Sequence, residues 1–219
     1  MNAASRVFAA QVMEPRKHAP LLILISAPSG AGKTTLCEGL LKARPEMSRA
    51  ITCTTRPPRP GEKDGVDYHF FSAAEFLKRL QAGNFLEHAT VYGNSYGILK
   101  SELLMKLRQG RDVLLNIDVQ GAATIRERAE SEPELKHALV TVFLTPDSAK
   151  VLEQRLRRRA ADARSVIQKR LSLARQEVSQ WRHFDYLLLS GTKTEDLHRM
   201  LEIIAAEKMR TSRSVAPGF

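Results

Sequence analysis

The strongest chemical signal in this sequence is a glycine-rich segment that follows a short apolar run and leads into a helix-like stretch. The pattern G-x-x-x-x-G-K-[ST] in that position is typical of loops that bind phosphate, and only its first glycine is replaced here, by Ala27. Gly30 and Gly32 allow backbone N–H groups to turn toward an anion, and a helix that begins at Lys33 adds the positive end of its dipole. Lys33 is placed to reach the β- and γ-phosphates, and the Thr34 hydroxyl to coordinate Mg²⁺. We therefore predict a nucleoside triphosphate site formed by Ala27, Pro28, Ser29, Gly30, Ala31, Gly32, Lys33, Thr34 and Thr35.

A second unusual segment combines arginines, prolines and tyrosines. Residues 51–62 have the sequence ITCTTRPPRPGE, residues 65–70 have the sequence GVDYHF, and a Tyr-Gly pair follows at residues 96–97. Together with the glycine-rich loop, these motifs make residues 21–208 similar to the guanylate kinase family, whose members transfer the γ-phosphoryl group of ATP to GMP. The resemblance implies ATP and GMP as ligands, with Mg²⁺ bound together with ATP. It also implies catalysis by positioning and electrostatic stabilisation, without a covalent intermediate.

The resemblance implies that Arg56, Arg59, Tyr68 and Tyr96 hold the phosphate of GMP. The chemistry of these side chains agrees, because two guanidinium groups and two phenolic hydroxyls form a dense set of donors for a phosphomonoester dianion. The prolines between the arginines stiffen the backbone, so less entropy is lost when this segment becomes ordered. Two further residues belong to the implied GMP-binding set: Glu62 of the same motif, and Thr52, where the family usually has serine.

Glu87 matches the carboxylate that binds guanine in the family. Guanine presents its N1–H and its exocyclic amino group on one edge, and a carboxylate accepts hydrogen bonds from both. Adenine has an acceptor at N1 and would leave the carboxylate unpaired, and a site of this kind discriminates by roughly 10⁴-fold or more. Ile98 departs from the family, which usually has a serine or threonine hydroxyl there. Loss of that hydroxyl is expected to weaken guanine binding by on the order of 1 kcal/mol.

Asp118 follows an apolar run, at a position where ligands bind in open parallel sheets. The resemblance implies that Asp118 contacts GMP or orders water molecules around Mg²⁺. Asn116 replaces a companion acid of the family and removes a negative charge near the phosphates. From the local pattern alone, an aspartate that only caps a turn is an equally good interpretation.

Residues 150–182 contain ten basic and three acidic residues, which gives a net charge of +7 within a chain whose total is +10. A run of charge is usually a solvated helix face, and several of these arginines fit that description. Arg155 and Arg159 are i, i+4 neighbours, and the resemblance implies that both, together with Arg170, form a lid over ATP and the transferring phosphoryl group. Farther along, Ser190-Gly191 replaces an Asn-Asp pair that the family often places near adenine, so adenine selectivity is expected to be loose.

These residues need a framework that brings distant segments together. Four short apolar runs alternate with amphipathic stretches, a pattern typical of parallel strands with helices on both faces; they are Leu21–Ile25, Val113–Ile117, Leu139–Leu144 and Tyr186–Leu189. We predict an α/β fold of the phosphate-loop nucleoside monophosphate kinase type, with a small mixed β insertion for GMP and a helical lid. The predicted parts are an extension (1–20), a core (21–51, 102–149 and 176–208), an insertion (52–101), a lid (about 150–175) and a tail (209–219). Within the insertion, short strands are expected around Val66–Phe71 and Asn84–Tyr92.

The composition excludes several other classes of protein. The chain of 219 residues is 43% apolar and 26% charged, as in an ordinary folded protein. It has two cysteines, no histidine pair at the spacing of metal ligands, and no apolar run near the roughly 20 residues that span a bilayer. We expect a cytoplasmic enzyme that binds neither nucleic acid nor membrane; the sequence does not predict its oligomeric state.

Two alternatives to an enzyme are compatible with parts of this sequence. One is a guanylate-kinase-like module that binds protein without catalysis, which the presence of Lys33, Thr34, Arg59 and Arg170 disfavours. The other is a nucleic-acid binder that uses the basic stretch, which the scarcity of aromatic residues there disfavours.

Overall fold

The computed structural model describes residues 18–91, 93–159 and 164–214. Its centre is a five-stranded sheet in the order β2-β7-β1-β8-β9, in which all neighbouring strands are parallel. The strands are β1 (Leu22–Ser26), β2 (Ser48–Arg49), β7 (Val113–Asn116), β8 (Leu139–Thr145) and β9 (Tyr186–Leu189). Four of them coincide with the apolar runs of the sequence, whereas β2 is too short to give such a signal. The predicted α/β class is therefore confirmed.

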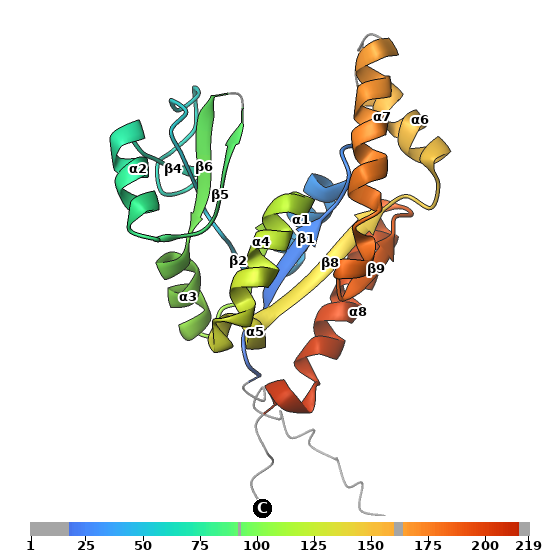
Figure 1. Cartoon of the computed structure of the whole chain (residues 1–219). Coiled ribbons are helices and arrows are strands. Elements are labelled where there is room, and N and C mark those ends of the chain that lie inside the picture. The colour runs from blue at the N-terminus through green and yellow to red at the C-terminus, as the bar shows by residue number, and fades with distance from the viewer. Residues whose placement is uncertain (1–17, 92, 160–163, 215–219) are drawn as a thin grey trace, which may run out of the picture.

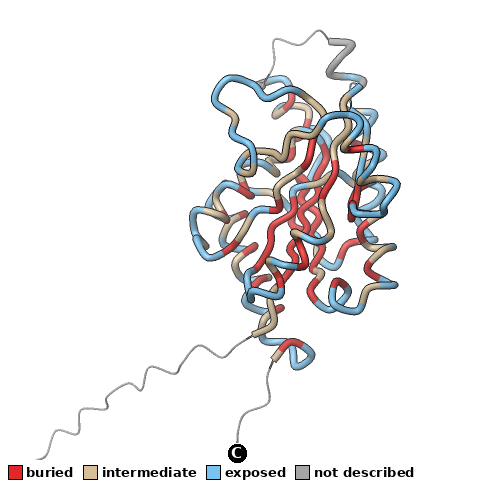
Figure 2. The backbone as a smooth tube through the Cα atoms, turned by 90° about the vertical axis from the view of Figure 1, so that its left-hand side faces the viewer, coloured by how far each residue is buried: buried red, intermediate tan, exposed pale blue. Residues whose placement is uncertain are grey.

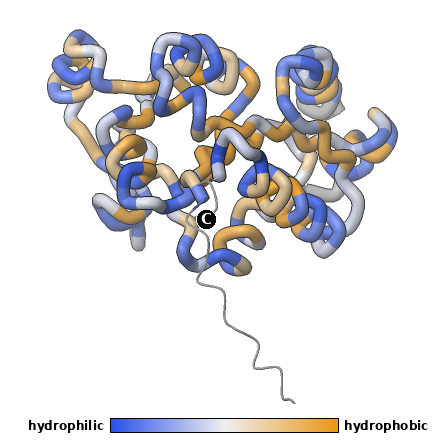
Figure 3. The backbone as a smooth tube through the Cα atoms, turned by 90° about the horizontal axis from the view of Figure 1, so that it is seen from below, coloured by the Kyte–Doolittle hydropathy of each residue, from blue (hydrophilic) through white to orange (hydrophobic). Residues whose placement is uncertain are grey.

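Helices cover both faces of this sheet, and the alternation of side chains along β1 decides which helices each residue meets. Leu22 and Leu24 belong to a buried cluster with α3, α4 and α5, whereas Ile23 and Ile25 belong to a second cluster with α1 and α8. These helices are α1 (Lys33–Ala43), α3 (Lys100–Arg108), α4 (Val119–Glu130), α5 (Pro133–Ala138) and α8 (Lys193–Lys208). Figure 2 shows the strands as the buried centre of the molecule, and Figure 3 shows apolar residues gathered inside a hydrophilic periphery.

A smaller mixed sheet, in the order β4-β3-β6-β5, forms the arm at the upper left of Figure 1 together with helix α2. Its elements are β3 (Thr52–Thr54), β4 (Tyr68–Phe70), α2 (Ala73–Gln81), β5 (Phe85–Val91) and β6 (Asn94–Leu99). Phe76 of α2 stacks on Phe85 with the ring centroids 4.4 Å apart, and both pack with Cys53 in a small core of their own. The two strands expected here correspond to β4 and β5, whereas β3, β6 and α2 were not predicted from the sequence.

A second arm rises on the other side of the central sheet and consists of α6 (Ala149–Arg159) and α7 (Arg164–Val178) (Figure 1). Leu152 and Leu156 of α6 pack against Ala174 of α7, so the two helices share a core. A short 3₁₀ turn, η1 (Trp181–His183), leads from α7 toward β9. No helix in the described ranges is long and apolar enough to cross a membrane.

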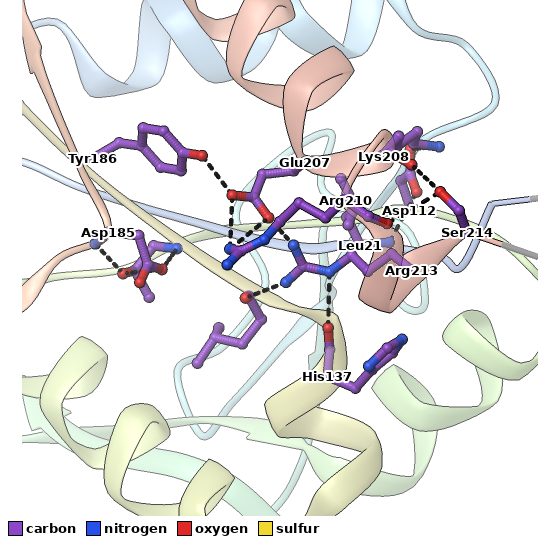
Figure 4. A network of polar contacts seen from close by, with 12 residues as sticks. Leu21, Asp112, His137, Asp185, Tyr186, Glu207, Lys208, Arg210, Arg213 and Ser214 are labelled. Atoms are coloured by element: carbon purple, nitrogen blue, oxygen red, sulfur yellow. Dashed lines mark hydrogen bonds and ion pairs between the residues drawn. The ribbon is translucent and has the colours of Figure 1, made fainter.

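A network of polar side chains joins the last described residues to the start of β8 (Figure 4). It lies at the end of the central sheet opposite the two arms (Figure 1). Glu207 is only 2% exposed and contacts Arg213 and the hydroxyl of Tyr186. Arg213 also donates to the backbone carbonyls of His137, at 2.9 Å, and Leu139, at 3.1 Å. We call Glu207, Arg213 and Tyr186 the basal clamp. It ties α8 and the following 3₁₀ turn, η2 (Thr211–Arg213), to the start of β8.

Candidate active site

The phosphate loop lies between the carboxyl end of β1 and the start of α1. Gly32 immediately precedes α1 with φ of 108° and Gly30 has φ of 89°, so both use backbone conformations that residues with a Cβ rarely adopt. A hydrogen bond of 3.1 Å from Ala31 N–H to the Pro28 carbonyl closes the turn. Ala27 is 4% exposed and packs in the apolar cluster beneath α1, so its methyl group fits where the pattern usually has glycine.

Lys33 connects this loop to the neighbouring strand. Its Nζ donates a 2.7 Å hydrogen bond to the carbonyl of Ile117, just beyond the end of β7. Burial lowers the pKa of Lys33, and the negative charges of Asp118 and Glu177 partly oppose that effect. The Lys33 ammonium therefore lies at the carboxyl end of β7, beside the phosphate loop.

The register of the small sheet explains how residues far apart in the sequence share one surface. Tyr68, Thr52, Ile98 and Glu87 are direct partners in one row across β4, β3, β6 and β5. Directly paired residues project from the same face of a sheet, so this row collects three predicted GMP-binding residues around Ile98. Tyr96 lies two residues from Ile98 and projects from the same face, with its ring centroid 6.4 Å from that of Tyr68.

Ile98 lies in the middle of this row and is 6% exposed. It belongs to the buried cluster that includes residues of α3 and α4. Where the family usually has a hydroxyl group, this chain therefore has an apolar side chain that packs the small sheet against the main core.

Arg56 is held in place before any ligand binds. Its guanidinium donates to both oxygens of Glu62, at 2.8 and 2.9 Å, and its Cζ lies 5.4 Å from the ring centroid of Tyr68. Glu62 also accepts a 2.7 Å hydrogen bond from the Arg59 N–H, which is the main reason that its pKa is lowered. The Arg59 guanidinium is exposed and has no hydrogen-bond partner in the part of the chain that the structure describes. Glu62 thus holds the Arg56 guanidinium and the backbone of Arg59, and its membership of the GMP-binding set stays a prediction.

Glu87 has the most strongly shifted pKa among the described carboxyl groups of the site. It is 9% exposed, and its pKa is raised to about 7 by burial and, to a smaller extent, by the charge of Asp118. Gly121, in the first turn of α4, lies so near that a Cβ added there would be 3.2 Å from the Glu87 carboxyl carbon. Gly121 N–H donates to Asp118 at 2.8 Å, so the start of α4 faces both acids.

Asp118 is the N-cap of α4, as the turn-capping interpretation proposed. Only its Oδ1 accepts the capping hydrogen bond, and the residue is exposed. The second oxygen therefore remains accessible to a ligand, so capping and ligand binding are compatible. Asn116 is also exposed, at the last position of β7.

Arg155 connects the second arm to the phosphate loop. Its guanidinium donates to the Ala31 carbonyl at 3.0 Å, to the Ser190 hydroxyl at 2.9 Å and to the Gly191 carbonyl at 3.2 Å. Asp196 of α8 accepts hydrogen bonds from Ser190 and from the Gly191 N–H. These residues line a pocket of about 360 Å³ beside Gly30 and Gly32.

The structure describes fewer contacts for the other two predicted lid arginines, Arg159 and Arg170. Arg159 is the last residue of α6, and its side chain lies outside the described part of the structure. Arg170 is half-buried in the second turn of α7. Glu177 of α7 lies in one cleft with Asp118 and was not predicted from the sequence, where it is only an isolated acid within a basic stretch.

The chain matches the guanylate kinase family model over residues 19–207. The chain belongs to this family. It is 44% identical over 191 residues to a guanylate kinase of Hahella chejuensis, covering 87% of this chain and 88% of that protein. A guanylate kinase of Coxiella burnetii is 43% identical over 189 residues, covering 86% of this chain and 88% of its own. The crystal structure of a guanylate kinase from Anaplasma phagocytophilum superposes with a TM-score of 0.69 at 31% identity, covering 92% and 93% of the two chains. As a member of the guanylate kinase family, the protein is a nucleotide-binding phosphotransferase.

Proposed function

We propose that this protein transfers the γ-phosphoryl group of ATP to GMP, giving ADP and GDP. The observation that supports the proposal is that two surfaces predicted to bind phosphate lie around one end of the central sheet. The phosphate loop and Lys33 lie on one side, and the row across the small sheet lies on the other, with Glu87 against the start of α4.

GMP is proposed to bind on the face of the small sheet. Arg56, Arg59, Tyr68 and Tyr96 supply the donors for its phosphate. Glu62 keeps Arg56 and the Arg59 backbone in position through its three hydrogen bonds, so little reorganisation accompanies binding. Ionised Glu87 accepts from the N1–H and the amino group of guanine, and Thr52 lies in the same row as Glu87. Asp118 faces the GMP side of the site from the start of α4.

ATP is proposed to bind with its phosphates on residues 27–35 and its adenine in the pocket beside Arg155. The hard oxygen donors of Thr34 and Asp118 suit Mg²⁺, which would enter with ATP and neutralise phosphate charge. Thr34 is exposed at the second position of α1, and one Asp118 oxygen is not used in capping.

Transfer then requires the two substrates to lie in line. An oxygen of the GMP phosphate attacks the γ-phosphorus, the bond to the bridging oxygen of ATP breaks, and ADP leaves with that electron pair. Lys33, together with Arg155, Arg159 and Arg170 of the second arm, supplies fixed positive charge for the oxygens on which charge is spread. Closure of the two arms on both nucleotides would exclude water and align them.

The test is an assay of ADP formation with ATP and a panel of acceptors comprising GMP, dGMP, IMP and AMP. We expect turnover with GMP, at least 10³-fold lower kcat/KM with AMP, and loss of turnover in Lys33→Ala with GMP affinity nearly intact. Absence of ADP release above background with GMP would instead favour a protein-interaction module.

A further inference from the structure

Asp196 is a buried acid in the wall of the pocket beside the phosphate loop. It lies in the first turn of α8 and is 7% exposed. Its Oδ2 accepts a 2.7 Å hydrogen bond from the Ser190 hydroxyl, and its Oδ1 accepts a 2.8 Å hydrogen bond from the Gly191 N–H. Both carboxylate oxygens are therefore paired with the segment that leads from β9 to α8, as the burial of a charged group requires.

The Ser190 hydroxyl links Asp196 to Arg155 of the second arm. A hydroxyl group has one proton, and because an ionised carboxylate only accepts, that proton is directed to Asp196. The Ser190 oxygen then presents its lone pairs to the Arg155 guanidinium, which donates to it at 2.9 Å. Gly191 makes a second link, since its N–H donates to Asp196 and its carbonyl accepts from Arg155 at 3.2 Å. Asp196 thus holds both of the residues that accept from Arg155 on this side of the pocket.

The helix that carries Asp196 is part of the main core, whereas Arg155 belongs to the second arm. Met200 and Ile204 of α8 lie in the buried cluster that includes residues of α1. Helix α6 packs with α7 in a small core of its own. Arg155 also donates to the Ala31 carbonyl of the phosphate loop at 3.0 Å. The hydrogen bonds of Asp196 therefore connect a side chain of the arm to the helix that packs beside α1, where the phosphate loop ends.

We propose that Asp196 is a positioning residue that holds the Arg155 guanidinium in the nucleotide pocket through Ser190 and Gly191. This inference rests on the proposed binding of ATP beside the phosphate loop. A guanidinium that is held in place before ATP arrives loses less side-chain entropy on binding. Because Asp196 acts through Arg155, loss of its charge should weaken ATP binding by no more than the loss of Arg155 itself.

The experiment measures the Kd of ATP by calorimetry, without GMP, for the full chain and its variants. Asp196→Asn keeps the size of the side chain but removes its charge and one of its two acceptors. We expect this variant to bind ATP about 3- to 5-fold more weakly than the unmodified protein, with KM for GMP changed less than twofold. When Arg155→Ala is already present, the same substitution should change the Kd of ATP less than about 1.5-fold, because the residue through which Asp196 acts is gone.

A second variant interrupts the same path without touching the buried charge. Ser190→Ala removes the hydroxyl and leaves Asp196 bonded to the Gly191 N–H. It should bind ATP about 2- to 3-fold more weakly, and this loss should also disappear when Arg155→Ala is present. If Asp196→Asn does not fold, this second cycle decides the question.

The matched control is Glu195→Gln, which removes an equal charge from the same turn of α8 and keeps an acceptor for the Thr192 N–H. It should leave the Kd of ATP unchanged. Equal weakening by Asp196→Asn with and without Arg155 would overturn the inference, since Asp196 would then act on the nucleotide directly or on the fold alone. An unchanged Kd in Asp196→Asn would overturn it as well. Failure of the proposed function is a separate result, because it would appear as lack of turnover with GMP whatever the ATP affinities.

Discussion

Three carboxyl groups near the site differ in their surroundings and in the direction of their pKa shifts. Glu62 is surrounded by donors and its pKa is lowered, which suits an acid that stays ionised to hold Arg56. Glu87 and Glu177 are partly or largely buried and their pKa values are raised. A raised pKa means that burial disfavours the ionised form, and a ligand that supplies hydrogen-bond donors would favour ionisation.

The first prediction concerns the pH dependence of GMP use. Because only the ionised form of Glu87 accepts from both guanine donors, kcat/KM for GMP should fall about tenfold per pH unit below the pKa of about 7 and level off above it. In Glu87→Gln, kcat/KM should be roughly 10²- to 10⁴-fold lower, and this titration should be absent. Steady-state kinetics from pH 5.5 to 9 measure both. An unchanged pH profile in the variant would show that another group titrates.

The same carboxyl should lower the stability of the ligand-free protein. A pKa raised on folding means that the folded state binds more protons, so the stabilising contribution is complete below the unfolded pKa near 4.5 and is lost as pH rises through about 7. Glu87→Gln should therefore be more stable than the unmodified protein at pH 8, by about 1–3 kcal/mol after allowance for solvent screening. Urea unfolding at pH 8 and pH 5 measures this, and an equal gain at both pH values would contradict the explanation.

A matched pair of helical glycines tests the packing around Glu87. In Gly121→Ala the new Cβ would lie 2.6 Å from Cγ1 of Ile117 and 3.2 Å from the Glu87 carboxyl carbon, so one of them must move. We expect KM for GMP to rise about tenfold or more, since small displacements in a site are costly. In Gly39→Ala the new methyl meets only Leu197, at 3.8 Å, and should stabilise α1 by about 0.5–1 kcal/mol without changing KM. Kinetics and thermal unfolding of both variants separate the two effects.

At the scale of elements, the sequence predicts helices and strands best where an apolar run or a motif marks them. The runs that form β1, β7, β8 and β9 predict the parallel sheet, and the loop pattern predicts the start of α1. The small sheet was less predictable because β3 and β4 have three residues each, and their pairing depends on contacts between distant segments. The packing of Ile98 could not be predicted for the same reason, since its partners in the row come from the distant strands β3 and β5. The position of Glu177 could not be predicted from the sequence because only the packing of α7 places it in one cleft with Asp118.

The link between the second arm and the loop gives a prediction at this scale. Arg155→Ala removes three hydrogen bonds to the loop and to residues 190–191. Because a hydrogen bond from a charged group contributes about 1.5–3 kcal/mol, we expect KM for ATP to rise about tenfold while KM for GMP changes less than twofold. The control Arg157→Ala removes an exposed arginine whose one ion pair among the described residues is with Glu153 of the same helix. If both variants change KM for ATP alike, general loss of positive charge explains the effect.

For the whole molecule, the basal clamp and the active site lie at opposite ends of the sheet. Arg213→Ala would leave Glu207 buried without its main partner, and breaking a buried pair costs about 3–5 kcal/mol. A drop in Tm of roughly 10 °C is expected for a chain of this size, with kcat nearly unchanged at 20 °C. Arg210→Ala, whose side chain is 62% exposed, should cost less than about 1 kcal/mol. Equal losses of stability in the two variants would show that the burial of Glu207 does not explain how the basal clamp stabilises the protein.

The clamp also brings the two ends of the described fold together, since Ala19 N–H donates a 3.0 Å hydrogen bond to the Arg213 carbonyl. The order in which the chain connects the helices and strands could therefore be changed without changing the fold. A short linker could join residues 213 and 19, and new ends could be opened at the exposed turn around Gly110, between α3 and β7. Such a circular permutant would keep every strand neighbour of the central sheet. Its new ends would lie outside the phosphate loop and outside both arms.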